Sequence, residues 1–122
     1  MFELVVRGHF SAAHQLRGYG GKCEALHGHN YKIDIHVTSD KLNEAGIAID
    51  FALLKDSLEG ILKELDHKFL NDLPQFTSIN PSAENIARFI FDRLLKKFET
   101  KGVELKKVGV WESDSCVAYY SR

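Results

Sequence analysis

Two histidines separated by a single glycine, His27 and His29, are the first residues in this chain whose types and spacing could do chemistry. In a β-strand, residues i and i+2 point to the same face, so these imidazoles would project side by side with Cα atoms about 6.5–7 Å apart. That arrangement suits two ligands of one zinc ion, whose bonds to histidine nitrogen measure about 2.0–2.1 Å. His14 could supply a third ligand if its segment pairs with the strand of His27, which would leave the fourth tetrahedral position open, as in a catalytic zinc site. An accidental His-Gly-His on a strand is the alternative.

A cysteine, an acid–imidazole pair and a glutamate could complete a reactive site. Cys23 lies four residues before His27, and a thiol near a metal and a histidine can lose its proton and act as a base. In Asp66-His67, the carboxylate could raise the basicity of the imidazole or fix its tautomer, although adjacent residues need a turn to face one target. Glu112 ends an apolar run and could accept two N–H donors from a guanidine-like edge. Burial of a small residue at Cys23 and a solvated strand end at Glu112 are the plainer interpretations.

The remaining histidines and the second cysteine have no such company. We expect His9 and His36 to be ordinary surface or hydrogen-bonded histidines. Cys116 lies in a strand-like alternation, so we expect it to be buried and not reactive.

Length and composition narrow the class of protein. The chain has 122 residues, 44% apolar and 27% charged, so we expect one globular domain over residues 1–122. Its 16 basic and 17 acidic residues give a net charge of -1, whereas a nucleic-acid binder usually has a basic surplus. We expect no signal peptide, because the sequence starts with a strand-like alternation. It has no apolar run near the roughly 18 residues of a membrane span, and too few cysteines for a disulfide framework. We therefore expect a cytoplasmic protein that binds neither membranes nor nucleic acid.

Alternating apolar residues predict the strands that position these side chains. The even-numbered residues from Phe2 to Phe10 are apolar or glycine, and the odd-numbered residues from His27 to Val37 form a second alternation. Residues 15–26 contain three glycines and little periodicity, which indicates a loop. Strands are predicted at 2–10, 27–37, 103–112 and 116–120, with a possible short strand at 47–49.

Two helical patterns lie between the second and the third of the longer strands. Asp50 can cap a helix whose apolar residues run from Leu54 to Leu65. Residues 80–84 contain helix-start chemistry, and a second apolar stripe runs from Ile86 to Phe98 before Gly102 ends it. The order strand, strand, helix, helix, strand, strand predicts an α+β fold with an antiparallel sheet and helices on one face.

Several short motifs occur in order along nearly the whole chain. They are FSAAH (10–14), CEALHGH (23–29), GIAIDF (46–51), LDH (65–67), LN (70–71), PSAEN (81–85) and ES (112–113). In this order the set resembles the 6-pyruvoyltetrahydropterin synthase / 6-carboxytetrahydropterin synthase family. The resemblance implies a tunnelling fold (T-fold): a four-stranded antiparallel sheet with two helices on one face. It also implies that subunits close into trimeric barrels, that two trimers stack as a homohexamer, and that the sites lie between subunits.

The resemblance also implies roles for the residues already singled out. Zinc would be the cofactor, and Cys23 would be the catalytic cysteine, with Asp66 and His67 as its partners from a neighbouring subunit. Glu112 would anchor the 2-amino and ring N–H edge of a pterin. The metal ligands implied are His14, His27 and His29, and the further substrate-binding residues implied are Ser82, where threonine is usual, and Glu84.

The spacing between cysteine and histidine points to one branch of the family. Three residues separate Cys23 from His27, which is similar to the bacterial 6-carboxytetrahydropterin synthases of queuosine biosynthesis. The expected function is that of a zinc-dependent lyase, which converts 7,8-dihydroneopterin triphosphate to 6-carboxy-5,6,7,8-tetrahydropterin with release of acetaldehyde and triphosphate. The triphosphate needs cations, and the candidates are Arg7, Lys22, Lys32 and Lys68.

Glu24, beside Cys23, keeps a second activity open. This Cys-Glu loop resembles a mixed subgroup in which a glutamate cleaves the same substrate to 6-hydroxymethyl-7,8-dihydropterin for folate synthesis. An exposed loop carboxylate is the plainer interpretation. A 6-pyruvoyltetrahydropterin synthase activity and a catalytically silent pterin-binding protein are further alternatives.

Overall fold

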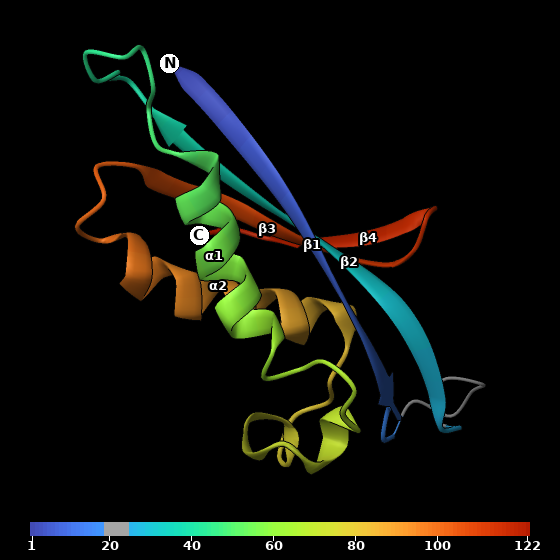
Figure 1. Ribbon diagram of the computed structural model, residues 1–122. Coiled ribbons are helices and arrows are strands. Elements are labelled where there is room, and N and C mark those ends of the chain that lie inside the picture. Colours follow the sequence, from blue (N-terminus) through green and yellow to red (C-terminus); the bar gives the residue numbers. More distant parts are fainter. Residues whose placement is uncertain (19–24) are drawn as a thin grey trace.

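The computed structural model describes residues 1–18 and 25–122 and has the α+β order expected from the sequence. Four antiparallel strands form one sheet in the order β1-β2-β3-β4 (Figure 1). The strands are β1 (Phe2–His14), β2 (His27–Ser39), β3 (Glu104–Ser113) and β4 (Cys116–Tyr120). Between β2 and β3 the chain forms α1 (Phe51–Leu62), the short 3-10 helices η2 (Leu70–Asp72) and η3 (Pro74–Phe76), and α2 (Ala83–Phe98).

The two long strands bury alternate residues against the helices. In β1 the even-numbered residues from Val6 to His14 are buried, and in β2 the odd-numbered residues from Tyr31 to Val37 are buried. Gly8 allows the closest approach, because a Cβ at this position would lie 2.8 Å from Cδ1 of Leu62 and 3.0 Å from Cδ2 of Leu58. The missing side chain therefore lets α1 pack directly on β1.

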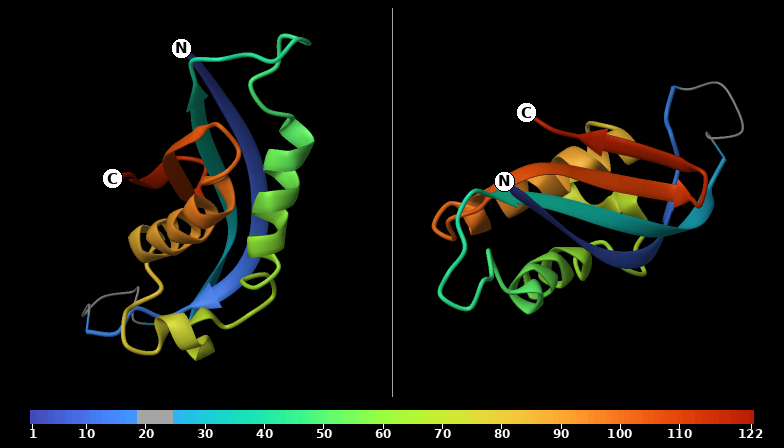
Figure 2. Two further views of the ribbon diagram at one scale, coloured as in Figure 1. Left: turned by 90° about the vertical axis from the view of Figure 1, so that its left-hand side faces the viewer. Right: turned by 90° about the horizontal axis from the view of Figure 1, so that it is seen from above.

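Both helices cover the same face of the twisted sheet, with α1 over β1 and α2 over β3 and β4 (Figure 2). A polar side chain caps the start of each helix. Asp50 accepts a hydrogen bond from the Ala52 N–H at 2.8 Å, and Ser82 accepts one from the Asn85 N–H at 3.2 Å. The predicted helix starts are therefore confirmed, and they fix where each helix crosses the sheet.

Several bounds differ from the sequence prediction: the second strand continues to Ser39, the third runs from Glu104 to Ser113, and the first helix ends at Leu62 although its apolar pattern continues to Leu65. The first strand does not end at Phe10 but continues to His14, because Ser11–His14 pair with the start of β2. The possible strand at 47–49 is wrong: Asn43 Oδ1 accepts the N–H groups of Ala45 and Ile47 in a turn, and both edges of β2 are already paired. The second helix ends at Phe98, and a turn leads to Gly102, whose φ of 74° is left-handed.

The face of the sheet opposite the helices carries charged pairs that join strands. Asp34 is buried there and accepts hydrogen bonds from Arg7 Nε at 2.6 Å and Trp111 Nε1 at 2.9 Å. Near the other end of the sheet, Glu3 accepts from Lys106 Nζ at 2.7 Å, and its other oxygen lies 3.1 Å from His36 Nδ1. These contacts tie β1 to β2 and β3.

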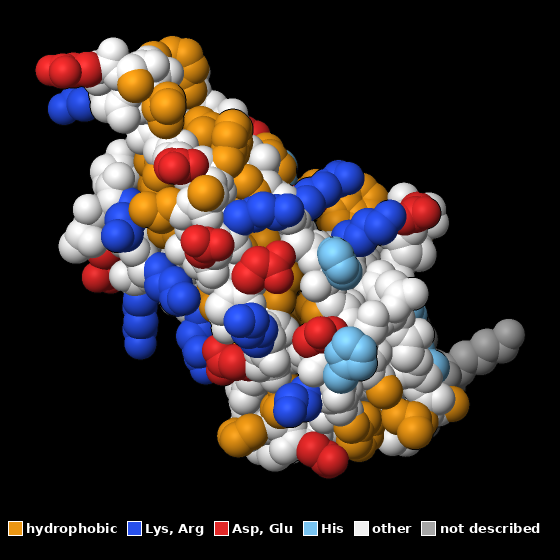
Figure 3. All heavy atoms as spheres, viewed as in Figure 1, with side chains coloured by type: hydrophobic (Ala, Val, Ile, Leu, Met, Phe, Trp, Pro, Cys, Tyr) orange, Lys and Arg blue, Asp and Glu red, His pale blue; other side chains and the backbone are white. Residues whose placement is uncertain are grey.

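Hydrophobic side chains gather on the surface near the N-terminus and the loop before α1 (Figure 3). They include Phe2, Leu42, Ile47 and Phe51, which line a pocket of about 410 Å³. None of the helices in the described part of the chain has the length and apolar character needed to cross a bilayer.

Candidate metal and substrate site

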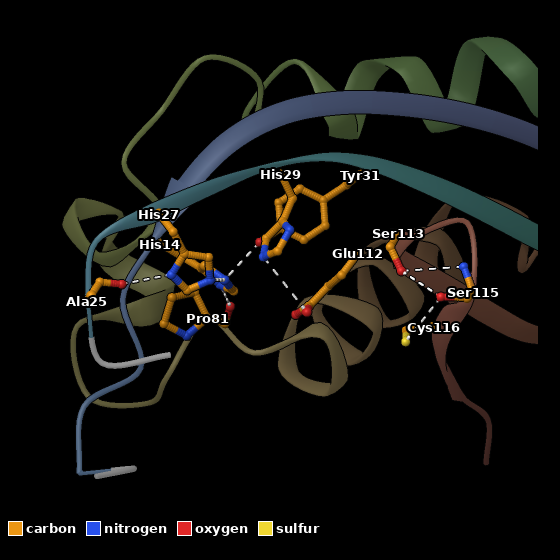
Figure 4. A network of polar contacts seen from close by, with 10 residues as sticks. All are labelled: His14, Ala25, His27, His29, Tyr31, Pro81, Glu112, Ser113, Ser115 and Cys116. Atoms are coloured by element: carbon orange, nitrogen blue, oxygen red, sulfur yellow. Dashed lines mark hydrogen bonds and ion pairs between the residues drawn. The ribbon is translucent and has the colours of Figure 1, made fainter. Parts of the chain in front are cut away.

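The adjoining ends of β1 and β2 bring three histidines together (Figure 4). His14, the last residue of β1, lies opposite His27, the first residue of β2, and His29 follows on the same face. The Nε2 atoms of His14 and His27 are 2.9 Å apart, and the candidate ligand nitrogens of all three rings lie within 4.8 Å of one another. The antiparallel register, together with the i, i+2 spacing, therefore forms the cluster expected from the sequence.

Two backbone carbonyl groups orient the rings of this cluster. His14 Nδ1 lies 2.7 Å from the Pro81 carbonyl oxygen, and His27 Nδ1 lies 2.7 Å from that of Ala25. Because a carbonyl oxygen can only accept, both Nδ1 atoms carry the proton in these hydrogen bonds. The Nε2 lone pairs of the two neutral rings then face each other, which is unfavourable unless a proton or a metal ion lies between them.

The donor set and its surroundings fit a divalent metal ion. Two nitrogens bound tetrahedrally to one zinc ion would lie about 3.3 Å apart, which is close to the observed separation. His29 Nε2 is buried and has no hydrogen-bond partner among the described residues. Burial lowers the pKa of His14, against the opposite effect of its bond to Pro81, and so favours the neutral ring that a metal ligand needs.

Glu112 reaches toward the same cluster from β3. Its Oε2 atom lies 3.8 Å from His29 Nε2, and with Glu84 of α2 it lines a pocket of about 420 Å³. Ser82 lies next to Ala83, another residue of that pocket, and its hydroxyl oxygen caps α2. The structure thus places Glu84 and Glu112, two of the three predicted substrate-binding residues, in one pocket beside the histidines.

Asp66 and His67 form a dyad at the free edge of β1. Asp66 Oδ2 lies 2.9 Å from His67 Nδ1, and its Oδ1 accepts the Ser11 N–H at 2.9 Å. This backbone bond is the main reason that the pKa of Asp66 is lowered, with the bond to His67 adding to it. His67 has a φ of 57°, a left-handed conformation that non-glycine residues rarely adopt. This turn lets two adjacent residues contact each other, which the sequence could not decide.

A second cavity is lined by residues from both the Asp66–His67 dyad and the histidine cluster. This cavity, of about 510 Å³, is lined by His29 and Asn30 of β2 and by His67 and Lys68. Of the predicted triphosphate cations that the structure describes, Lys68 lies in this wall, whereas Arg7 and Lys32 line a separate pocket with Trp111. The fourth candidate, Lys22, lies outside the described residues.

Sequence reasoning missed Tyr31 and the two orienting carbonyls. Tyr31 is fully buried, its ring stacks on Phe10 at 4.7 Å, and its hydroxyl lies 3.1 Å from His14 Nδ1. Burial raises the pKa of Tyr31, so the phenol keeps its proton. The spacing from His29 to Tyr31 was a signal that could have found it, because both lie on the same face of one strand.

The predictions for the two cysteines, Cys23 and Cys116, have different outcomes. Cys23 and the neighbouring Glu24, both predicted catalytic residues, lie outside the described residues. The expectation that Cys116 is buried is wrong: it is exposed at the start of β4, next to the turn that joins β3 to β4. Its thiol lies 3.7 Å from Ser115 Oγ (Figure 4).

Known proteins resemble this chain in sequence and in structure. A profile of the family described as 6-pyruvoyl tetrahydropterin synthase matches residues 3–122. A Synechocystis protein named 6-carboxy-5,6,7,8-tetrahydropterin synthase is 41% identical over 117 residues, which cover 91% of this chain and 86% of that protein. A Pyrococcus furiosus protein named dihydroneopterin monophosphate aldolase is 34% identical over 112 residues, which cover 92% and 90%. The structure of 6-pyruvoyl tetrahydropterin synthase from Caenorhabditis elegans has a TM-score of 0.89 and 26% identity, and the match covers 99% of this chain and 95% of that one.

Proposed function

This chain belongs to the 6-pyruvoyl tetrahydropterin synthase family, and from that premise we propose that it is a zinc-dependent lyase acting on 7,8-dihydroneopterin triphosphate. The proposed products are 6-carboxy-5,6,7,8-tetrahydropterin, acetaldehyde and triphosphate, as in queuosine biosynthesis. The observation that carries the proposal is the convergence of three histidines beside Glu112 at one end of the sheet. The Synechocystis relative supports the choice of product, because it carries the corresponding name.

His14, His27 and His29 would hold the zinc ion. When bound, the metal would supply a Lewis acid that lowers the pKa of the substrate's side-chain hydroxyl groups. The protein contributes the orientation of the ligands, because Pro81 and Ala25 hold the Nδ1 protons of two rings and leave their Nε2 atoms free.

Glu112 would fix the substrate ring relative to this centre. An ionised carboxylate can accept two N–H groups from the pterin edge, as it does from an arginine side chain. Glu84, on the wall of the same pocket, would bind a second part of the ring, and Ser82 would keep the start of α2 in place beside it. Such anchoring aligns the side chain of the substrate with the histidine cluster.

The dyad of Asp66 and His67 would move a proton. The lowered pKa of Asp66 keeps its carboxylate ionised, so it holds the proton on His67 Nδ1 and leaves Nε2 able to accept another. Following the resemblance, we propose that this dyad serves a neighbouring subunit's centre and that six copies assemble.

We propose Cys23 as the base that deprotonates the substrate side chain. A Cys23→Ala variant should lose acetaldehyde release by about 10²-fold or more while its zinc content stays unchanged. Mass spectrometry of the product and metal analysis of the same sample test both points. Full activity with bound zinc would contradict this role.

The aldolase name of the Pyrococcus furiosus relative favours one alternative, cleavage to 6-hydroxymethyl-7,8-dihydropterin with Glu24 as the base. In this case a Glu24→Ala variant should lose the hydroxymethyl product and keep the carboxy product. Glu44→Ala is the matched control, because Glu44 is an exposed loop glutamate elsewhere in the chain. Equal loss of both products in Glu24→Ala would argue against a separate base.

A further inference from the structure

Two asparagine side chains hold the segment that follows β1. The Gln15 N–H donates to Asn71 Oδ1 at 2.9 Å, and Asn71 Nδ2 donates back to the Gln15 carbonyl at 2.7 Å. Arg17 makes the same pair with Asn80, its N–H donating to Oδ1 and its carbonyl accepting from Nδ2, both at 2.9 Å. Each primary amide thus offers the donor and the acceptor that a neighbouring strand would offer.

These pairs continue a ladder that begins on the backbone. The Ser11 carbonyl accepts from the His67 N–H at 2.6 Å, and the Ala13 N–H donates to the Lys68 carbonyl at 3.0 Å. Every second residue from 11 to 17 is therefore bonded along one edge, which is the alternation of an extended chain. His14 lies within this ladder, with bonded residues on both sides.

The guanidinium group of Arg17 donates hydrogen bonds to the loop that follows η3. Nη1 donates to the Thr77 carbonyl at 3.1 Å, while Nη2 donates to those of Phe76 at 2.6 Å and Ile79 at 2.8 Å. Nε donates to Asn80 Oδ1 at 3.2 Å. The guanidinium therefore bonds four acceptors through three nitrogens, whereas the ammonium group of lysine has only three donors, all on one nitrogen.

The loop held in this way leads directly to the carbonyl that orients His14. Pro81 follows Asn80 and accepts the His14 Nδ1–H at 2.7 Å. The Asn80 carbonyl in turn accepts from Asn85 Nδ2 at 2.8 Å, which joins the loop to α2. Both ends of the bond between His14 and Pro81 are therefore next in the chain to a clamped residue, Gln15 at one end and Asn80 at the other.

We propose that Arg17, Asn71 and Asn80 are positioning residues of the metal site. By fixing the chain after His14 against the loop before Pro81, they keep the Nδ1–H of His14 donating to the Pro81 carbonyl and present Nε2 toward His27. We call these three residues the clamp. Without the clamp, the ring of His14 would have to be ordered each time a metal ion binds. This proposal rests on the proposed function, because it concerns the same three-histidine cluster.

Metal affinity measured on the full-length protein tests the clamp without any substrate. Cobalt(II) is the probe, because its visible absorption reports binding and ligand geometry, and zinc affinity follows by competition. The variants are Arg17→Ala, Arg17→Lys, Asn71→Ala and Asn80→Ala. The matched controls are Asn43→Ala, which removes an asparagine that bonds two N–H groups in a distant turn, and Arg93→Ala, which removes an arginine paired with Glu64. Circular dichroism and the thermal midpoint of metal-free samples report folding.

The proposal expects the dissociation constant for cobalt to rise about 10-fold in Arg17→Ala and Asn80→Ala, the lower end of the cost of losing a direct partner of a metal ligand, because the Pro81 carbonyl itself is kept. Arg17→Lys should behave like Arg17→Ala, and both controls like the wild type. If Arg17→Ala does not fold, Asn71→Ala must still weaken cobalt binding, because it removes only the pair of hydrogen bonds to Gln15. Wild-type affinity and spectrum in the clamp variants, with binding lost in His14→Ala, would overturn the clamp and leave the metal site standing. A wild-type protein that binds neither cobalt nor zinc would overturn both.

Discussion

At the scale of single residues, the site depends on which nitrogen of each imidazole carries the proton. Carbonyl groups hold the Nδ1 protons of His14 and His27, while a carboxylate partners His67. With Nδ1 protonated, each of these rings keeps a lone pair on Nε2. We propose that His14 and His27 use it to bind the metal ion, and that His67, whose Nδ1 faces a carboxylate, uses it to transfer a proton.

Glu112→Gln should weaken substrate use while leaving the fold intact. The amide of glutamine would turn an N–H toward the pterin N–H edge, so one charge-assisted hydrogen bond is lost and the ratio kcat/KM should fall about 10–100-fold. Steady-state kinetics on the zinc-loaded protein measure this change. Glu104→Gln, an exposed glutamate at the other end of β3, should match the wild type. Unchanged kinetics in Glu112→Gln would contradict the anchoring role.

At the scale of elements, β1 does most of the positioning. One face carries His14 into the cluster, one edge pairs with β2, and the other edge holds the turn that contains Asp66 and His67. The close contact of α1 on Gly8 sets how that turn leaves the helix, because the turn begins directly after Leu62. Packing in the middle of β1 is thereby linked to the geometry at its end.

Gly8→Ala should destabilise the protein by about 1–3 kcal/mol, since its Cβ would press on the buried side chains of Leu58 and Leu62. Gly60→Ala is the matched control: Gly60 is exposed in α1, and a Cβ there would meet only the end of the Lys97 side chain, at 3.4 Å. The control should not lower the free energy of unfolding, because alanine is the better helix former by about 0.8–1 kcal/mol. Chemical denaturation of metal-free samples compares the two, and equal costs would show that Gly8 is not a packing position.

The link across β1, β2 and β3 at Glu3 should make stability depend on pH. Hydrogen bonds from Lys106 and His36 lower the pKa of Glu3 from 4.5 to about 2. The ionised Glu3 therefore stabilises the fold at pH values above the pKa that Glu3 has in the unfolded chain. This contribution is lost as the pH falls toward 2. Glu3→Gln should be less stable than the wild type at pH 6, and the difference should vanish between pH 4.5 and pH 2. Thermal midpoints across this range measure it, and a difference that stayed constant would contradict the link.

At the scale of the whole molecule, the pattern of apolar residues was enough to predict four strands, two helices and their order. Apolar residues recur at every second position in the strands and at helical spacing in the helices, and polar caps at Asp50 and Ser82 mark the helix starts. These are local signals that the tertiary structure did not override. The stretch at 47–49 failed because its start closes a turn, in which Asn43 Oδ1 accepts the N–H groups of Ala45 and Ile47, and an apolar pattern does not reveal this. Cys116 failed because β4 is an edge strand and α2 leaves its start uncovered.

Less of the candidate site could be predicted, because its contacts join distant segments. The spacing of His27 and His29 predicts that their side chains lie on the same face of a strand. The place of His14 depends in addition on the strand register, which sets it opposite His27. The Pro81 carbonyl contacts the ring of His14, 67 residues away in the chain, and the side-chain amide of Asn80 bonds the backbone of Arg17, 63 residues away. Because a backbone atom takes part in each contact, the pattern of side chains does not predict either one. The structural contacts of Cys23 and Glu24 fall outside the described residues, so their roles remain predictions.

The sheet face opposite the helices should be buried between copies of this chain. Exposed Val5, Val117 and Tyr119 lie on or beside this face, and β1 and β4 are the two edge strands. Following the family resemblance, native mass spectrometry should show six copies. Val117→Lys should shift the assembly toward smaller species, whereas Lys55→Ala on the exposed side of α1 should not. A fully active monomer would contradict both the hexamer and the sharing of sites between subunits.

The most direct measurement is anaerobic turnover of 7,8-dihydroneopterin triphosphate by the zinc-loaded wild-type protein, with the pterin product identified by its mass. We expect 6-carboxy-5,6,7,8-tetrahydropterin together with acetaldehyde, and no product after zinc is removed by a chelator. A 6-hydroxymethyl product alone would contradict the proposed reaction and move the catalytic base to Glu24. No turnover by protein that holds both zinc and the pterin would contradict the assignment as an enzyme.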